Sequence, residues 1–266
     1  MRRLLETTAL VVAVSVGSAA AQGNDLAVQE IVDKASAAAY YQGEDGRAEV
    51  SMTITDDQGR ERNREFVILR KDIDDQDNGE QRFYVYFNRP ADVNRTAFMV
   101  WKHIGRDDDR WLYLPALDLV KRIAASDERT SFVGSHFFYE DVSGRGPDED
   151  NHELVDETDT YYIVESTPKD PSDTEFAKYR NYIHKDSFIP VKTDYYDSNG
   201  DIYRTYNAEK VEVIGGYPTV VQSSITDSTI GGSTTLSYAD VEYGIGLPTD
   251  IFTERYLRQP PRKYLR

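Results

Sequence analysis

The fold of this chain is decided by the stretch WLYLPALDLVKRIAASDERTSFVGSHFFYED, which runs from Trp111 to Asp141. Its first part alternates Leu112 and Leu114 with Trp111 and Tyr113 until a proline interrupts it, a pattern that predicts a β-strand. Its second part gathers aromatic residues around a glycine: Phe132, Phe137, Phe138 and Tyr139 around Gly134. So much aromatic area must be covered, either by ordinary core packing or by an apolar ligand.

Outward from this stretch, one helix is followed by many strands. Residues 25–41 space apolar side chains at helical intervals, with Asn24 or Asp25 as a candidate N-cap, and end before Gly43. From Val50 onward the period changes to two, and glycine-rich turns recur along the chain. The strand-like runs are residues 48–55, 62–71, 81–88, 95–104, 109–114, 119–124, 160–167, 176–185, 190–197, 202–214, 217–228 and 233–243.

These runs predict a mainly β (α+β) protein. No helical pattern separates consecutive strands, which argues against a parallel α/β sheet and favours an antiparallel meander. A sheet of this size must curl and cover one face. We therefore expect one large curled antiparallel sheet in the form of a half-open barrel, with the N-terminal helix and the segment around 134–150 as lids.

The N-terminus has the pattern of an export signal. Arg2 and Arg3 precede a short apolar stretch and the triplet Ala19, Ala20 and Ala21, which predicts a signal peptide over residues 1–21 and a single domain over residues 22–266. No apolar stretch approaches the ~20 residues that a membrane helix requires. The sequence contains no cysteine, hence no disulfide and no lipid-anchoring residue. We expect a soluble periplasmic protein that is not lipid-anchored.

The charge of the chain excludes some partners. A formal net charge of −16 argues against nucleic acid and anionic bilayers. The densest acidic run, Asp148 to Asp150 with Glu153, is interpreted as a solvated loop, with a cation site as the alternative. Neither a metal nor a cofactor is predicted.

Catalytic residues are not predicted either. The four histidines lie in no spacing with a recognised mechanism, and Ser135 and His136, although adjacent, would face opposite sides of a strand. A hydrolase that uses this pair is the alternative. Glu140 and Asp141 are neighbouring carboxylates, and we interpret Asp141 as a clamp that accepts backbone N–H groups near Gly134 and Ser135.

Several motifs together resemble the outer-membrane lipoprotein-sorting-protein-like family, relatives of the periplasmic carrier LolA. They are WLYLPAL, KRI and SFVGSHFFYED, then Met52-Thr-Ile-x-Asp with Gly59, Phe87-x-x-Pro90-x-Asp92-Val93-x-x-Thr96-Ala-Phe98, and Leu247-Pro-x-Asp250-x-Phe252-Thr-x-x-Tyr256-Leu257. The family-motif loop residues are Trp111, Tyr113, Pro115, Gly134, Ser135, Glu140 and Asp141. Two positions depart from the family's pattern, since His136 replaces a commonly acidic residue and Phe138 a common serine.

The resemblance implies a dry pocket for acyl chains on the inner face of an incomplete barrel. The apolar strand and lid residues that would line it are Val50, Met52, Ile54, Phe66, Ile68, Phe83, Val85, Phe87, Phe98, Val100, Leu112, Leu114, Phe132, Phe137 and Tyr139, with ordinary core packing as the alternative for each. It also implies lipid or lipoprotein acyl chains as cargo, an inner-membrane transporter of the resistance-nodulation-division type, and an outer-membrane acceptor.

The sequence thus predicts a periplasmic carrier that binds cargo without a covalent step. Its first rival is a sensor module that binds a lipid or peptide and regulates a membrane transporter. Its second rival is the lipid-ester hydrolase with Ser135 and His136.

Overall fold

The computed structural model describes residues 26–74, 76, 78–172 and 174–266. The predicted signal peptide and the predicted N-cap therefore lie outside the described residues. The described part contains no helix that is long and apolar enough to cross a membrane.

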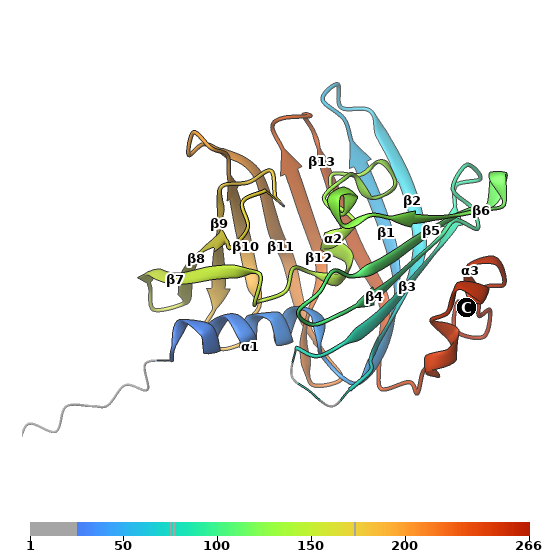
Figure 1. Cartoon of the computed structure of the whole chain (residues 1–266), viewed down its shortest axis with the longest axis horizontal. Coiled ribbons are helices and arrows are strands. Elements are labelled where there is room, and N and C mark those ends of the chain that lie inside the picture. Colours follow the sequence, from blue (N-terminus) through green and yellow to red (C-terminus); the bar gives the residue numbers. More distant parts are fainter. Residues whose placement is uncertain (1–25, 75, 77, 173) are drawn as a thin grey trace, which may run out of the picture.

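The main element of the described part of the chain is one antiparallel sheet of thirteen strands (Figure 1). Its order is β6-β5-β4-β3-β2-β1-β13-β12-β11-β10-β9-β8-β7. The strands are β1 (Asp45–Thr55), β2 (Glu61–Asp72), β3 (Gln81–Arg89), β4 (Ala97–Lys102), β5 (Asp109–Leu114), β6 (Leu119–Ile123), β7 (Asp150–Glu157), β8 (Tyr161–Pro168), β9 (Lys178–His184), β10 (Pro190–Tyr196), β11 (Ile202–Ile214), β12 (Tyr217–Asp227) and β13 (Ser233–Tyr243). The predicted meander is confirmed, because almost every strand pairs with its neighbour in sequence, and β1 pairs with β13 to join the two halves.

The sheet curls without closing, as predicted. Its edges are β6 and β7, which follow each other in sequence, so the segment between them must cross the open side. We call residues 124–149 the lid segment. It contains a short helix, α2 (Glu140–Ser143), and Figure 1 shows α2 in front of the sheet between its two halves.

Strand β7 was missed by the sequence patterns. The run DNHELVDE looks like a loop because its side chains are mostly polar or charged, yet it pairs with β8 along its length. An edge strand with one solvated side tolerates such charges, and they discourage pairing with other chains. The acidic run is therefore not wholly a solvated loop: Asp150 begins β7 and is buried, and Glu153 lies on that strand.

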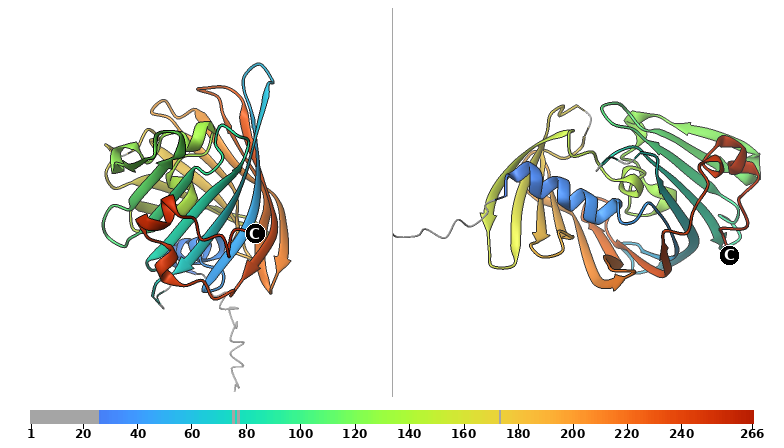
Figure 2. Two further views of the ribbon diagram at one scale, coloured as in Figure 1. Left: turned by 90° about the vertical axis from the view of Figure 1, so that its right-hand side faces the viewer. Right: turned by 90° about the horizontal axis from the view of Figure 1, so that it is seen from below.

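Helix α1 (Val28–Tyr40) lies across the concave side of the sheet (Figure 2). Its buried residues Ile31 and Ala35 pack against Val164 and Ile183 of β8 and β9. The helix is therefore fixed to the β7–β9 half, and its C-terminal end reaches toward the β1–β4 half, where Gln81 Nε2 donates to the Tyr40 carbonyl over 2.8 Å.

The β2–β5 part of the sheet is buried on both faces. Alternation in β1 puts Val50, Met52 and Ile54 on the inner side, where they join the aromatic core beneath the lid segment. The outer side of β2–β5 is covered by the C-terminal segment, which contains α3 (Glu254–Arg258) and packs its Leu247 and Phe252 there. Trp101 Nε1 donates to the Phe252 carbonyl over 2.8 Å, which fixes this cover.

Candidate ligand-binding cavity

A cavity of about 380 Å³ lies between the inner face of the sheet, α1 and the lid segment. Strands from both halves contribute to its wall, as do the face of α1 from Val32 to Tyr40 and lid residues from Phe132 to Pro147. The volume falls near the lower end of the ~300–1,000 Å³ that is usual for small-molecule sites. The cavity is thus large enough for one compact apolar ligand.

The wall from β1, β2 and β3 is apolar. It consists of predicted residues at alternate strand positions, facing two aromatic residues of the lid segment: Met52, Phe66, Ile68, Phe83, Val85, Phe132 and Phe137. Their period of two is what puts them on the same face. The structure therefore brings these residues of the predicted set together around the cavity.

The other predicted lining residues lie beside the cavity and not on its wall. Phe132 connects the two groups, since its ring centroid lies 5.4 Å from that of Phe98 and 5.6 Å from that of Tyr139. The remaining members are in the same buried core or pack against it: Val50, Ile54, Phe87, Phe98, Val100, Leu112, Leu114 and Tyr139. They support the wall from behind.

The wall from β9 to β13 was not predicted. Tyrosines and short polar residues line it, with Tyr179 from β9, Tyr195 from β10, Tyr206 from β11 and Tyr238 from β13. These residues lie in predicted strands, but the sequence contains 19 tyrosines and nothing in it marks the inward ones. The available signal was the spacing of two residues between Ser223 and Ile225 and between Leu236 and Tyr238, which places a polar and an apolar residue on the same face of each strand.

The family-motif residues divide between the two faces of the sheet. Trp111 and Tyr113 face outward and pack beneath the C-terminal segment, so this part of the aromatic stretch does not face the cavity. Pro115 begins a single 3-10 turn after β5. Gly134 has a φ of +80°, which the tight turn of the lid segment requires, and its carbonyl accepts from Arg62 Nη2 over 3.3 Å.

Asp141 clamps the lid segment, although not onto the groups that were predicted. Its Oδ2 atom accepts the Phe138 N–H over 2.6 Å and pairs with the guanidinium of Arg204 on β11. Arg204 is 1% exposed and lies over the Phe138 ring at 4.2 Å from its centroid. The carboxylate therefore joins the lid segment to the sheet, and the predicted partners near Gly134 and Ser135 are corrected to Phe138 and Arg204.

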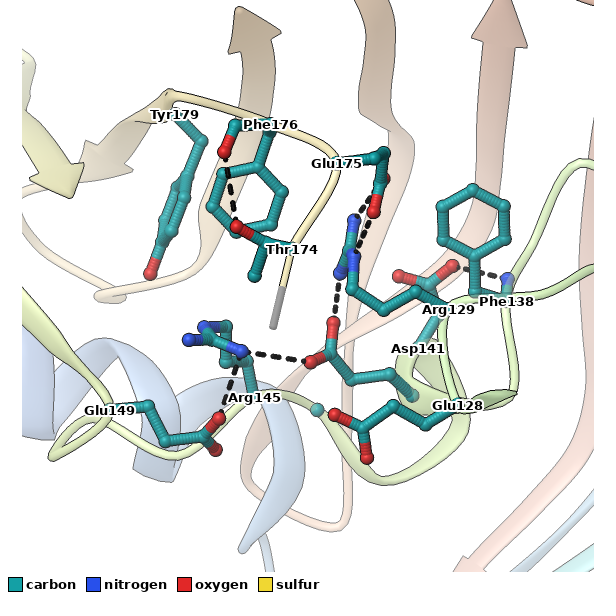
Figure 3. A network of polar contacts seen from close by, with 12 residues as sticks. Glu128, Arg129, Phe138, Asp141, Arg145, Glu149, Thr174, Glu175, Phe176 and Tyr179 are labelled. Atoms are coloured by element: carbon teal, nitrogen blue, oxygen red, sulfur yellow. Dashed lines mark hydrogen bonds and ion pairs between the residues drawn. The ribbon is translucent and has the colours of Figure 1, made fainter. Parts of the chain in front are cut away.

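A buried ion network extends this attachment to the β7–β9 half (Figure 3). Arg129 pairs with Glu140 and, over 2.7 and 2.8 Å, with both oxygens of Glu175 in the segment before β9. Arg145 pairs with Glu140 over 3.2 Å and with Asp150 over 3.0 Å. Glu140 is thus shared by two arginines, and the lid segment is connected by charge to the strands on the far side of the cavity.

Burial shifts the pKa values in this network. Burial would lower the pKa of Arg129, but Glu140 and Glu175 hold it well above its ordinary value. Glu128 lies nearby, and burial raises its pKa to about 7 even though Arg110 beside it acts in the opposite direction. Arg129 is therefore a permanent cation, whereas Glu128 titrates near neutral pH.

A single buried lysine joins α1, β4 and the lid segment. Lys102 Nζ donates to the carbonyls of Ser143 and Gly144 over 2.8 and 3.2 Å, and it lies over the Tyr40 ring, 5.4 Å from the centroid. Burial lowers the pKa of Lys102. Gly144 has a φ of +74°, and a Cβ there would lie 2.5 Å from the Tyr40 ring, so only glycine allows this close packing.

Ser135 and His136 take structural parts. The Ser135 hydroxyl donates to the Phe137 carbonyl over 3.3 Å and accepts the Phe137 N–H over 3.1 Å. The His136 ring contacts the Thr234 hydroxyl over 2.8 Å through Nδ1 and the Gly231 carbonyl over 3.0 Å through Nε2. The Ser135 hydroxyl therefore stabilises a turn within the lid segment, and the His136 ring fixes this segment to β13 and the turn before it.

The acidic run does not gather into a cation site. Asp150 is occupied by Arg145, and its Oδ2 also accepts from the Tyr179 hydroxyl over 2.7 Å. Among residues 26–266, apart from the three that are not described, no group of three or more histidine and acidic side chains is placed to hold a metal ion.

Comparisons with known proteins place the chain among LolA-like folds. Residues 79–259 match a family model described as "Uncharacterized protein". A crystal structure of a DUF1329 family protein from Desulfovibrio piger is 28% identical with a TM-score of 0.79, and the match covers 86% of this chain and 97% of that one. A putative outer membrane lipoprotein-sorting protein domain from Vibrio parahaemolyticus is 26% identical with a TM-score of 0.77 over the same shares, 86% and 97%.

A LolA superfamily protein from Nitrosomonas europaea shares the fold at 21% identity and a TM-score of 0.67, over 87% of this chain and 99% of that one. None of the curated proteins matches the chain.

Proposed function

Because the chain belongs to the DUF1329 and lipoprotein-sorting-protein-like family of LolA-type proteins, we propose that it is a periplasmic carrier of lipid or lipoprotein acyl chains. The observation that carries the proposal is the cavity itself. Its apolar wall from β1–β3 faces Phe132 and Phe137 of a lid segment that crosses the open side of the sheet.

The energetics of such a cavity suit reversible binding. Each buried methylene of an acyl chain contributes roughly 0.8 kcal/mol, so ten methylenes contribute about 8 kcal/mol before entropic costs. This binds a chain firmly in water but leaves it exchangeable with a membrane or a partner that offers similar surroundings. A carrier that transfers cargo by binding, without a covalent step, needs nothing more.

The lid segment is the part that must open. It is fixed to the sheet by Asp141 with Arg204 and by the shared Glu140, contacts that can break and reform without disturbing strand pairing. In this proposal cargo is handed between an inner-membrane transporter of the resistance-nodulation-division type and an outer-membrane acceptor, and the carrier is exported by its signal peptide.

The test measures how tightly the mature protein and variants of its cavity wall bind a fluorescent C16 fatty acid analogue. Met52→Asp places a carboxylate in the apolar wall, and we expect probe affinity to fall more than tenfold because a buried unpaired charge is costly. Phe137→Asp tests the same wall from the lid segment, where the sheet is left intact. Val213→Asp, at a position 74% exposed, is the matched control and should bind as the parent does.

Equal probe binding by Met52→Asp, Phe137→Asp and the control, with all three folded by circular dichroism, would exclude the cavity as the cargo site.

A further inference from the structure

Hydroxyl groups line the side of the cavity that α1 and strands β9–β13 form. Ser36 and Tyr40 are four residues apart on α1, so they share the helix face that lines the cavity. Tyr195, Tyr206 and Tyr238 approach from three strands. All five residues line the cavity, and burial raises the pKa of Tyr40 well above its ordinary value, with Asp141 acting in the same direction.

One of these hydroxyls lacks a partner in the protein. The Ser36 hydroxyl is buried and makes no hydrogen bond. The hydroxyls of Tyr206 and Tyr238, in contrast, share Ser223 as a hydrogen-bond partner. A buried polar group without a partner costs roughly 1–3 kcal/mol, so the free Ser36 hydroxyl, among phenols that line the same cavity, is better explained as half of an interaction whose other half is a ligand.

The phenols of the cluster can donate hydrogen bonds at neutral pH. Burial raises the pKa of Tyr238 to about 12 and also raises that of Tyr195, so the phenols stay protonated. Each phenol can both donate to and accept from a ligand oxygen.

The charges of the cavity wall are already neutralised inside the protein. Arg47 pairs with Glu49 over 2.6 Å, and Arg70 with Asp72 over 2.6 Å. Asp141 and Arg145 belong to the clamp and the ion network of the lid segment. A charged ligand head would therefore find no unpaired counter-charge on the cavity wall, which is unfavourable.

The wall from β1–β3 and the lid segment is apolar, so the cavity has two chemically different sides. We propose that the cargo is a compact amphiphile with an uncharged head that carries hydroxyl or carbonyl oxygens, bound with its head at the hydroxyl cluster and its apolar body against Met52, Phe66 and Phe132. The volume of about 380 Å³ fits one chain or one rigid apolar body better than several chains. This inference rests on the proposed carrier function and names the class of its cargo.

The test compares three probes that share a linear apolar chain and differ in the head, and it adds cholesterol as a probe with a rigid apolar body. The probes are 1-monopalmitoylglycerol, palmitate, hexadecyltrimethylammonium and cholesterol, each in competition with the fluorescent analogue below its micelle concentration at pH 7.5. Monopalmitoylglycerol should bind at least tenfold tighter than palmitate and than the cation. Binding of cholesterol at the affinity of monopalmitoylglycerol would identify a rigid alcohol as an equal member of the class; weaker binding would assign the class to flexible chains.

Variants separate recognition of the head from packing. Tyr195→Phe removes one hydroxyl and should weaken monopalmitoylglycerol roughly 3- to 10-fold while leaving palmitate unchanged. Ser36→Ala should also weaken it, yet keep or raise the melting temperature of the empty protein, because it removes an unpartnered hydroxyl and adds a better helix former. Tyr217→Phe, on the outside of the β11–β12 hairpin, is the matched control.

If all heads bind alike and Tyr195→Phe changes nothing, the inference on the head is overturned while the carrier function stands. Preferred binding of palmitate would overturn the uncharged head in the same way. If no probe binds at all, the failure is that of the carrier function itself.

Discussion

Replacement of Phe132 by alanine tests whether the lid segment is part of the folded core. The Phe132 side chain is 2% exposed, and its ring lies 6.4, 5.8, 5.4 and 5.6 Å from the rings of Phe66, Phe87, Phe98 and Tyr139. A buried Phe→Ala change costs about 3–5 kcal/mol, because the lost transfer free energy is joined by the cost of the cavity that remains.

In a domain of this size about 1 kcal/mol corresponds to roughly 2–4 °C in melting temperature. Phe132→Ala should therefore lower the melting temperature by about 6–20 °C in thermal unfolding followed by circular dichroism. Hydrogen exchange should also accelerate at the Phe132 amide, which donates to the Phe137 carbonyl over 2.7 Å. Leu117→Ala, in the same stretch but 69% exposed, is the control and should change stability by no more than about 0.5 kcal/mol. A Phe132→Ala shift no larger than that of the control would refute a lid segment packed as core.

Three further changes follow from the contacts of the lid segment. The folded-state pKa of Glu128, about 7, is above its ordinary 4.5, so its stabilising effect is complete below pH 4.5 and is lost as pH rises through 7. Glu128→Gln should therefore flatten the dependence of unfolding free energy on pH over that window, by on the order of 1 kcal/mol per pH unit. A dependence parallel to that of the parent in urea titrations would contradict the assignment. Gly144→Ala should destabilise the protein more than Gly59→Ala, because the two glycines have similar φ, +74° and +76°, but only a Cβ at position 144 would press against Tyr40. Equal urea midpoints for the two variants would show that this close packing does not matter for stability. Asp141→Asn removes the charge that pairs with a buried arginine, so release of a fluorescent fatty acid should accelerate several-fold in stopped flow, and an unchanged release rate would show that this clamp does not limit opening.

Local patterns made the apolar half of the cavity predictable. Phe66 and Ile68 of β2, and Phe83 and Val85 of β3, lie two residues apart, and the structure places them on one wall of the cavity. The dense aromatic cluster around Gly134 was visible as a unit because its members are close in sequence. The family resemblance then supplied the inner face on which they meet.

Long-range geometry was not predictable from the same patterns. Which of the tyrosines in β9 to β13 point inward depends on the curl of the sheet and on register shifts such as the one between Tyr195 and Tyr196 in β10. The partners of Asp141 depend on a turn in which Val133 has a φ of 50°, and the sequence does not predict this because β-branched residues rarely adopt a positive φ. Strand β7 was hidden because an edge strand accepts the charges of a loop.

The carrier function is tested most directly on the mature protein purified without detergent from the periplasm of its own cells. Native mass spectrometry and organic extraction would show whether a lipid is bound. We expect one bound lipid per protein molecule, with an uncharged oxygen-bearing head, and its loss from Phe137→Asp but not from Val213→Asp. A protein that emerges empty and also takes up no fluorescent fatty acid would contradict the carrier function.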